Sequence, residues 1–174
     1  MSNYRQIIQY DKDLGHKYVE NTKSRVKYGN DAYFIETDQF GFRNSFSKFK
    51  SDFTILVLGD SFAAGDGVSN EHRFSDLIQN ELDCNVVNLA VSGYGVDQQL
   101  LAYEKYGDQI DHDLVLFIPH LDDLKRNLLS EREGIDQTTK KPISIPKPYF
   151  EIDKEELILK NVPVPRERIQ LGTN

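Results

Sequence analysis

Residues 54–67 read TILVLGDSFAAGDG, and this stretch decides the fold class. A short continuous apolar run rich in β-branched residues is typical of a buried strand. The glycine turn that follows is typical of the carboxyl edge of a parallel sheet, where α/β proteins keep their ligand sites. Ser61 lies in this turn. The turn therefore either cradles a phosphate or presents Ser61 as a nucleophile.

The residues after this stretch alternate between helical and strand patterns. We expect strands near 54–58, 85–90 and 113–118, and helices near 72–82 and 97–109. Asp97 is the expected cap of the second helix, since its carboxylate accepts from free N–H groups of the first turn. Strands that alternate with helices imply an α/β fold with a parallel sheet and right-handed crossovers.

The chain divides into three zones that differ in composition and in sequence pattern. Residues 1–52 form an aromatic-rich N-terminal arm that holds ten of the nineteen Tyr and Phe residues, and we expect these rings to pad the core. Residues 53–130 form the α/β core. Residues 131–174 carry five of the six prolines and read as an extended tail with a hairpin whose turn lies near 153–155.

Composition excludes several classes of partner. The chain has 174 residues and a formal charge of −7, with no basic tract that could follow a phosphate backbone, so nucleic acid is not expected as a partner. No stretch reaches the roughly 18 apolar residues of a membrane span, and the start lacks the apolar segment of a secretory signal. We therefore expect a cytoplasmic protein. Cys84 is the single cysteine and reads as a buried, inert thiol.

The phosphate interpretation of the turn lacks its usual residues. Asn70 stands where a third glycine of the dinucleotide pattern belongs, no lysine occurs between Lys50 and Lys105, and two acidic residues would repel a phosphate. The nucleophile interpretation needs a serine on a tight turn and N–H donors near the developing oxyanion. Gly-Asp-Ser meets the first demand, although an ordinary helix-capping turn can have the same sequence.

Two blocks of the chain resemble the GDSL or SGNH hydrolases: TILVLGDSFAAGDGV at 54–68 and VVNLAVSGYGVDQQL at 86–100. The segments DQFGFRN at 38–44 and KPYFEIDKEELILKNVPVP at 147–165 are similar to flanking segments of bacterial members. The resemblance implies a three-layer fold with a flavodoxin-like parallel sheet. It also implies an esterase that cleaves an ester or O-acyl group, on a small molecule such as an acylated carbohydrate or a lipid, without a cofactor.

The resemblance assigns roles to two residues and leaves a third role open. Ser61 would be the nucleophile and would donate its own backbone N–H to the oxyanion, and Gly93 would donate a second backbone N–H. The family's third donor is an Asn side chain, but the matching stretch at 116–127 offers Leu121, Asp122 or Asp123. An ionised Asp would repel the oxyanion, so it could help only when protonated. Asn127 lies four to six residues beyond these positions.

The family's general base, a His in an Asp-x-x-His block, has no counterpart in the sequence. His120 is the candidate replacement base, because it follows the third expected strand and has Asp122 and Asp123 beside it; otherwise it is a loop residue. A metal site from these three residues is disfavoured, since near-consecutive residues seldom converge on one ion. Lys125 and Arg126 could instead pair with the two acids on a solvated helical turn.

Two interpretations follow from these departures. The chain is a serine hydrolase, or it is a non-catalytic SGNH-like binding domain that has lost its base and its amide donor. The missing last strands suggest the N-terminal part of a longer protein, in which case the chain alone is inactive, or else a degenerate member. An incomplete sheet would expose an apolar edge that favours self-association.

Overall fold

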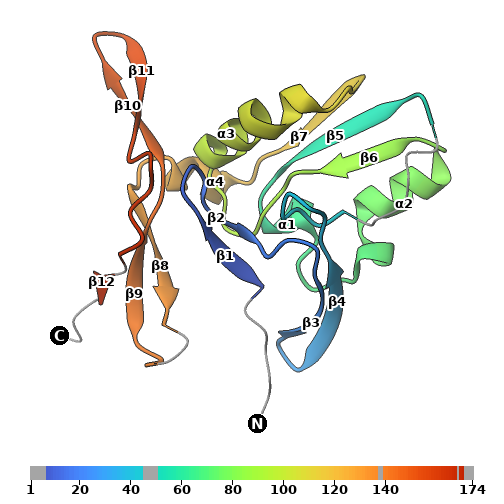
Figure 1. Ribbon diagram of the computed structural model, residues 1–174, viewed down its shortest axis with the longest axis horizontal. Coiled ribbons are helices and arrows are strands. Elements are labelled where there is room, and N and C mark those ends of the chain that lie inside the picture. Colours follow the sequence, from blue (N-terminus) through green and yellow to red (C-terminus); the bar gives the residue numbers. More distant parts are fainter. Residues whose placement is uncertain (1–6, 45–50, 137–138, 168, 171–174) are drawn as a thin grey trace.

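The computed structural model describes residues 7–44, 51–136, 139–167 and 169–170. Its centre is a three-stranded parallel sheet in the order β6-β5-β7, drawn in Figure 1 beside smaller antiparallel sheets. The strands are β5 (Thr54–Gly59), β6 (Asn85–Asn88) and β7 (Leu114–Ile118). The structure therefore confirms a mixed α/β fold with parallel core strands at the expected places.

The central strand β5 is buried along its whole length, which explains its continuous apolar sequence. Its last residue must be glycine. A Cβ at Gly59 would lie 2.4 Å from the Cβ of Ala63 and 2.9 Å from the carbonyl oxygen of Ile118. The missing side chain thus lets the chain turn from β5 into α1 (Ser61–Ala64) against the neighbouring strand.

The helices lie close to the expected positions. They are α2 (Phe74–Glu81), α3 (Val96–Tyr106) and α4 (Leu121–Arg126), with short 3-10 turns η1 (Asn70–His72) and η2 (Gly107–Gln109) before α2 and after α3. Ala102 and Tyr106 of α3 belong to the hydrophobic core, and Phe74 and Ile78 of α2 pack against it. Within the described residues, no helix combines the length and the apolar character that a membrane crossing requires.

The expected cap of α3 is wrong. The helix begins one residue before Asp97, its N-cap is Gly95, and the Gln98 side chain accepts a hydrogen bond from the Gly95 amide at 3.2 Å. Asp97 lies in the first turn, where one carboxylate oxygen accepts from the Gln98 amide at 2.8 Å. Its other oxygen binds a lysine far along the chain.

Two hairpins form the N-terminal zone: β1 (Ile8–Asp11) with β2 (Gly15–Tyr18), and β3 (Lys23–Tyr28) with β4 (Asp31–Glu36). Leu14, Tyr18 and Phe42 are buried in the same core as the parallel sheet. The aromatic residues of this zone therefore do contribute to the packing of the α/β core.

The C-terminal zone is built from antiparallel strands. Strands β8 (Glu131–Ile135), β9 (Pro142–Pro146) and β12 (Ile169–Gln170) form one sheet, and β10 (Tyr149–Asp153) pairs with β11 (Glu156–Lys160) in a hairpin. Figure 1 shows this hairpin projecting away from the parallel sheet. Lys154 and Glu155 both have positive φ, as the favoured two-residue hairpin turns require, so the predicted hairpin and its turn are confirmed.

A buried lysine attaches this C-terminal zone to the core. Lys147 is 1% exposed, and its ammonium group forms an ion pair with Asp97. It also donates to the carbonyl oxygens of Leu129 at 3.1 Å and Pro148 at 2.9 Å. Burial lowers the pKa of Lys147 and raises the pKa of Asp97, while the attraction within the pair opposes both shifts. The pair thus holds the start of β10 against the start of α3.

Strand β7 has the sequence of an interior strand but lies at an edge. Leu114 is 47% exposed and Phe117 is 46% exposed, although continuous apolar runs are typical of parallel strands that are covered on both faces. In the part of the chain that the structure describes, only β5 pairs with β7. The expected exposed apolar edge is confirmed, and self-association through it stays a prediction.

Replacing the buried lysine tests the attachment of the C-terminal zone. We expect Lys147→Met to lower the free energy of unfolding by about 3–5 kcal/mol, because the Asp97 carboxylate stays buried without its counterion. Lys125→Met is the control, since the ion pair of Lys125 with Asp122 is exposed, and it should cost less than about 1 kcal/mol. Urea unfolding followed by circular dichroism measures both, and equal small losses would contradict the expectation.

Candidate active site

Ser61 is the first residue of α1 and directly follows the buried end of β5. The N-cap residue Asp60 accepts a hydrogen bond from the Phe62 amide at 2.9 Å, which fixes the turn. The Ser61 side chain is half-buried, and no hydrogen bond involves its hydroxyl among the described residues. A serine hydroxyl is thus held on a tight turn, and no described residue competes for it.

A buried arginine from the N-terminal zone fixes the loop after α1. The guanidinium of Arg43 donates to the carbonyl oxygens of Ala64, Gly65 and Val68, each at 2.8 Å. Arg43 is 1% exposed. It lies in DQFGFRN, which the sequence marks only as a turn and a family-like flank. In the sequence, only its position as a single arginine among apolar and turn residues indicates that Arg43 could be a buried hydrogen-bond donor.

Gly93 lies in the loop that follows β6, at the same edge of the sheet as Ser61. Its φ of +83° is strained for residues with a side chain, which explains the glycine. In the described part of the chain, the backbone amides of Gly93 and Ser61 have no hydrogen-bond partner. The preceding residue, Ser92, donates its hydroxyl to Asp66, so the Gly93 loop is bonded to the loop after α1.

Arg126 joins the residues that flank Ser61 and Gly93. Its Nη1 lies 3.2 Å from a carboxylate oxygen of Asp60 and 3.2 Å from the carbonyl oxygen of Tyr94. The residue before Ser61 and the residue after Gly93 therefore meet at one nitrogen atom. Both expected pairs form, since Lys125 binds Asp122 and Arg126 binds Asp123. The expected solvation holds only for the first pair, because Asp123 is buried and Arg126 also binds Asp60.

Asp123 is fully buried beneath the site. Its carboxylate accepts from the His120 backbone amide at 2.9 Å and from Gln99 at 2.9 Å, and it also pairs with Arg126. Burial raises the pKa of Asp123 and the nearby Asp60 raises it further, while the hydrogen bonds from His120 and Gln99 lower it. The contacts of Asp123 thus close α4 onto the Ser61 turn.

The side chains of Leu121, Asp122 and Asn127 do not face the Ser61 turn. Leu121 is 75% exposed, and Asp122 lies on the surface, where its pKa is lowered by Lys125. Asn127 accepts a hydrogen bond from the Asp97 amide at 3.1 Å, so its side-chain oxygen serves the start of α3.

His120 lies next to the Ser61 turn but does not bind the serine. Its ring stacks on the Phe62 ring, with centroids 4.9 Å apart and planes 19° apart. Its Nδ1 accepts a hydrogen bond from the Asp122 amide at 3.2 Å. No hydrogen bond joins His120 to Ser61 in the described residues. The structure thus places His120 at the same edge of the sheet as Ser61 without a hydrogen bond between the two described residues.

Two further sequence expectations concern Cys84 and a metal site. Cys84 is a free thiol and 5% exposed, so its expected burial is confirmed. Over the described ranges, His, Cys, Asp and Glu side chains form no group of three or more that could hold a metal ion.

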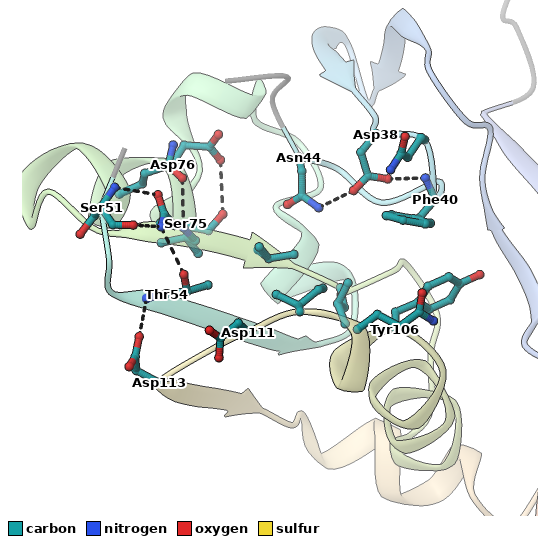
Figure 2. Close-up of a pocket in the computed structure, with 18 of the residues that line it drawn as sticks. Asp38, Phe40, Asn44, Ser51, Thr54, Ser75, Asp76, Tyr106, Asp111 and Asp113 are labelled. Carbon is teal, nitrogen blue, oxygen red and sulfur yellow. Dashed lines mark hydrogen bonds between the residues drawn. The ribbon is translucent and has the colours of Figure 1, made fainter. Parts of the chain in front are cut away.

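A cavity of about 860 Å³ lies away from Ser61. Figure 2 shows it at the starts of the parallel strands, with Thr54 and Asp113 on one side and the loop at Asp38 on the other. Its acidic residues support the backbone: Asp113 accepts from the Thr54 amide at 2.8 Å, and Asp38 accepts from the Phe40 amide at 2.9 Å. The cavity is therefore separate from the carboxyl edge that holds Ser61.

Comparison with models of protein families gives no match, and comparison with curated proteins gives none either. The resemblance to SGNH hydrolases therefore depends on the sequence blocks.

The buried His16 behind the Gly93 loop generates a prediction about pH. Its Nε2 lies 2.9 Å from the Ser92 carbonyl oxygen, and burial, aided by the charge of Arg132, lowers the pKa of His16 to about 3. The unfolded chain takes up this proton near pH 6.5, so folding loses stability as the pH falls below that value, by about 1.4 kcal/mol per pH unit. We expect His16→Gln to remove this slope in unfolding measured between pH 7 and pH 5.

The matched control is His72→Gln, since His72 is exposed. It should keep the slope of the unchanged protein. An identical slope in the His16 variant would show that His16 does not stay neutral in the folded state.

Proposed function

We propose that the protein is an SGNH-type serine hydrolase that cleaves an ester or O-acyl group, with Ser61 as nucleophile. One observation carries the proposal: the Ser61 hydroxyl and the backbone amides of Ser61 and Gly93 lie at the carboxyl edge of the sheet, and no described residue forms a hydrogen bond with any of the three. This edge is where parallel sheets keep their sites. The sequence blocks around both residues support the assignment.

The chemistry follows from these groups. The Ser61 oxygen attacks the carbonyl carbon of the ester, and a base takes the hydroxyl proton. The amides of Ser61 and Gly93 donate to the oxygen that becomes negative. The alcohol then leaves with a proton, and water hydrolyses the acyl-enzyme to free the carboxylic acid. An O-acylated carbohydrate or another small ester is the substrate class in this proposal.

The contacts of His120 determine whether its ring can act as the general base for Ser61. The Asp122 amide donates a hydrogen bond to Nδ1 of His120, so Nδ1 carries no hydrogen. The neutral ring therefore carries its hydrogen on Nε2. A ring in this tautomer has no free lone pair to offer Ser61 at Nε2. To act as the base, His120 must release the Asp122 amide and leave the Phe62 ring.

This arrangement of His120 favours a second candidate function, a binding domain that keeps the SGNH pocket without turnover. Such a domain would hold acylated carbohydrates at the same edge. Titration with acetylated sugars separates the two candidates, since binding without hydrolysis supports the binding domain and repeated turnover contradicts it.

Covalent labelling tests the nucleophile. The hydrolase candidate predicts that a fluorophosphonate probe labels the protein and fails on Ser61→Ala, because the probe reacts with an activated serine next to oxyanion donors. Ser69→Ala is the matched control, since the Ser69 hydroxyl accepts from the Phe34 amide and lies outside the turn. Mass spectrometry of the labelled protein gives the result, and equal labelling of both variants would reject Ser61.

Hydrolysis of an activated acetate ester tests the base. General-base help is worth about 10²- to 10⁴-fold, so without it the chain should hydrolyse the ester only marginally faster than buffer, and His120→Ala should leave the rate unchanged. A rate that rises through the imidazole pKa and collapses in His120→Ala would instead establish His120 as the base. Initial rates between pH 5 and pH 9 distinguish these outcomes.

A further inference from the structure

Strand β7 leaves one edge of the parallel sheet open. Figure 1 shows β5 on one side of it, and no described residue pairs with its other side. The free side of an edge strand has unpaired N–H and C=O groups, which can pair with a strand of another molecule. Many proteins prevent this with a charge, a proline or a bulge in the edge strand. Strand β7 reads LVLFI, so it has neither a charge nor a proline.

The side chains of β7 are exposed on both faces of the sheet. Leu114 and Phe117 are each close to half exposed, and Val115 is 37% exposed. Consecutive side chains of a strand point to opposite faces, so Leu114 lies on one face and the other two residues lie on the opposite face. Apolar surface therefore borders the free edge on both sides.

Helix α4, which follows β7, also leaves apolar side chains exposed. Leu121 and Leu124 lie one turn apart on the helix, and both are more than half exposed. Leu128, just after the helix, is 86% exposed. The same helix buries Asp123, whereas a surface helix usually turns its apolar stripe toward the core. The segment after β7 thus adds apolar surface that the described residues leave exposed.

We propose that two copies of this chain pair through β7, with antiparallel strands and a two-fold axis at Leu116. In this register Leu114 faces Ile118 of the other copy, Val115 faces Phe117 of the other copy, and Leu116 faces its own equivalent. All five residues of each strand then have an apolar partner. A β-branched residue opposite an aromatic ring is a favourable cross-strand pair. The same patch serves both copies, as a two-fold interface requires.

The residues that flank β7 favour this register over its neighbours. Asp113 precedes the strand, and Pro119 follows it. A two-fold axis at Val115 would place the Asp113 carboxylate opposite Phe117. An axis at Phe117 would bring Pro119, which has no N–H group, into the ladder opposite Val115. The axis at Leu116 leaves both flanking residues at the ends of the ladder.

The size of the interface explains why α4 belongs to it. A standard interface buries about 800 Å² per partner, which a five-residue strand alone does not supply. Antiparallel pairing places the end of β7 in one copy beside the start of β7 in the other. Helix α4 begins three residues after β7 ends, so its exposed leucines lie near that start and enlarge the buried area.

Engineered cysteines test the register. Cys84 is the single native cysteine and is buried, so it does not interfere. Directly opposite residues of an antiparallel pair have Cα atoms about 4.5–5.5 Å apart, within the range of a disulfide. Under mild oxidation we expect Leu116→Cys to form a covalent dimer. A mixture of Leu114→Cys with Ile118→Cys should also form one, although neither variant should do so alone. Leu157→Cys, exposed on β11, is the control and should stay monomeric in non-reducing electrophoresis.

Sedimentation equilibrium tests the interface without oxidation. We expect the unchanged chain to dimerise between about 1 and about 100 μM. Val115→Lys should weaken dimerisation at least about tenfold, because a lysine in an edge strand opposes pairing. Leu124→Ser should also weaken it, whereas Leu157→Lys, with the same added charge on the β10–β11 hairpin, should leave it unchanged. Circular dichroism checks that each variant is folded, and only folded variants count.

Four results would overturn the proposal. They are a monomer at about 100 μM, dimerisation that Val115→Lys leaves unchanged, cross-linking of Leu114→Cys alone as readily as in the mixture, and open-ended association beyond the dimer. The first would show that the free edge does not recruit a second copy. The third would show association without the proposed register. The cysteine variants keep the proposal testable if the lysine variant does not fold.

Discussion

The guanidinium of Arg43 is the contact on which the candidate active site depends. A tight turn at the end of a buried strand leaves backbone carbonyl groups that water cannot reach, and each of them needs a donor. Arg43 supplies donors for three such groups in the loop after α1, all at 2.8 Å. The N-terminal zone, which precedes the sheet in sequence, thereby fixes the end of α1 and the loop that follows it, directly after the Ser61 turn.

A second arginine, Arg126, joins three segments at the same edge of the sheet. Arg126 binds Asp60, Asp123 and the Tyr94 carbonyl, so α4, the Ser61 turn and the Gly93 loop converge on one cation. Two buried carboxyl groups face a single guanidinium here, and this arrangement is consistent with the raised pKa of Asp123. Asp123, one of the three residues that the resemblance to SGNH hydrolases offers for an amide donor, is thus part of a structural charge cluster in this chain.

The strands were predictable because continuous apolar runs separated by helical patterns have few alternative folds. The 154–155 turn was predictable from its local sequence. The role of Asp97 was not, because its partner Lys147 lies fifty residues further along and only the folded chain brings them together. The role of Arg43 was missed because most of its partners are backbone oxygens, which no sequence pattern displays. The bridge that Arg126 forms to Asp60 and Tyr94 was missed because both lie far from it along the chain. The stacking of His120 on Phe62 is likewise a contact through space.

The burial of Lys147 also links the folding of the C-terminal zone to that of the α/β core. Sequence composition divides the chain near residue 130, but the Lys147 ammonium group binds Asp97 and the carbonyl oxygens of Arg126 and Leu129, which all lie before that boundary. If the C-terminal hairpins detached alone, they would leave a buried carboxylate without its cation. We therefore expect core and hairpins to unfold in one cooperative transition, and a chain cut near residue 130 to give two fragments that do not fold separately.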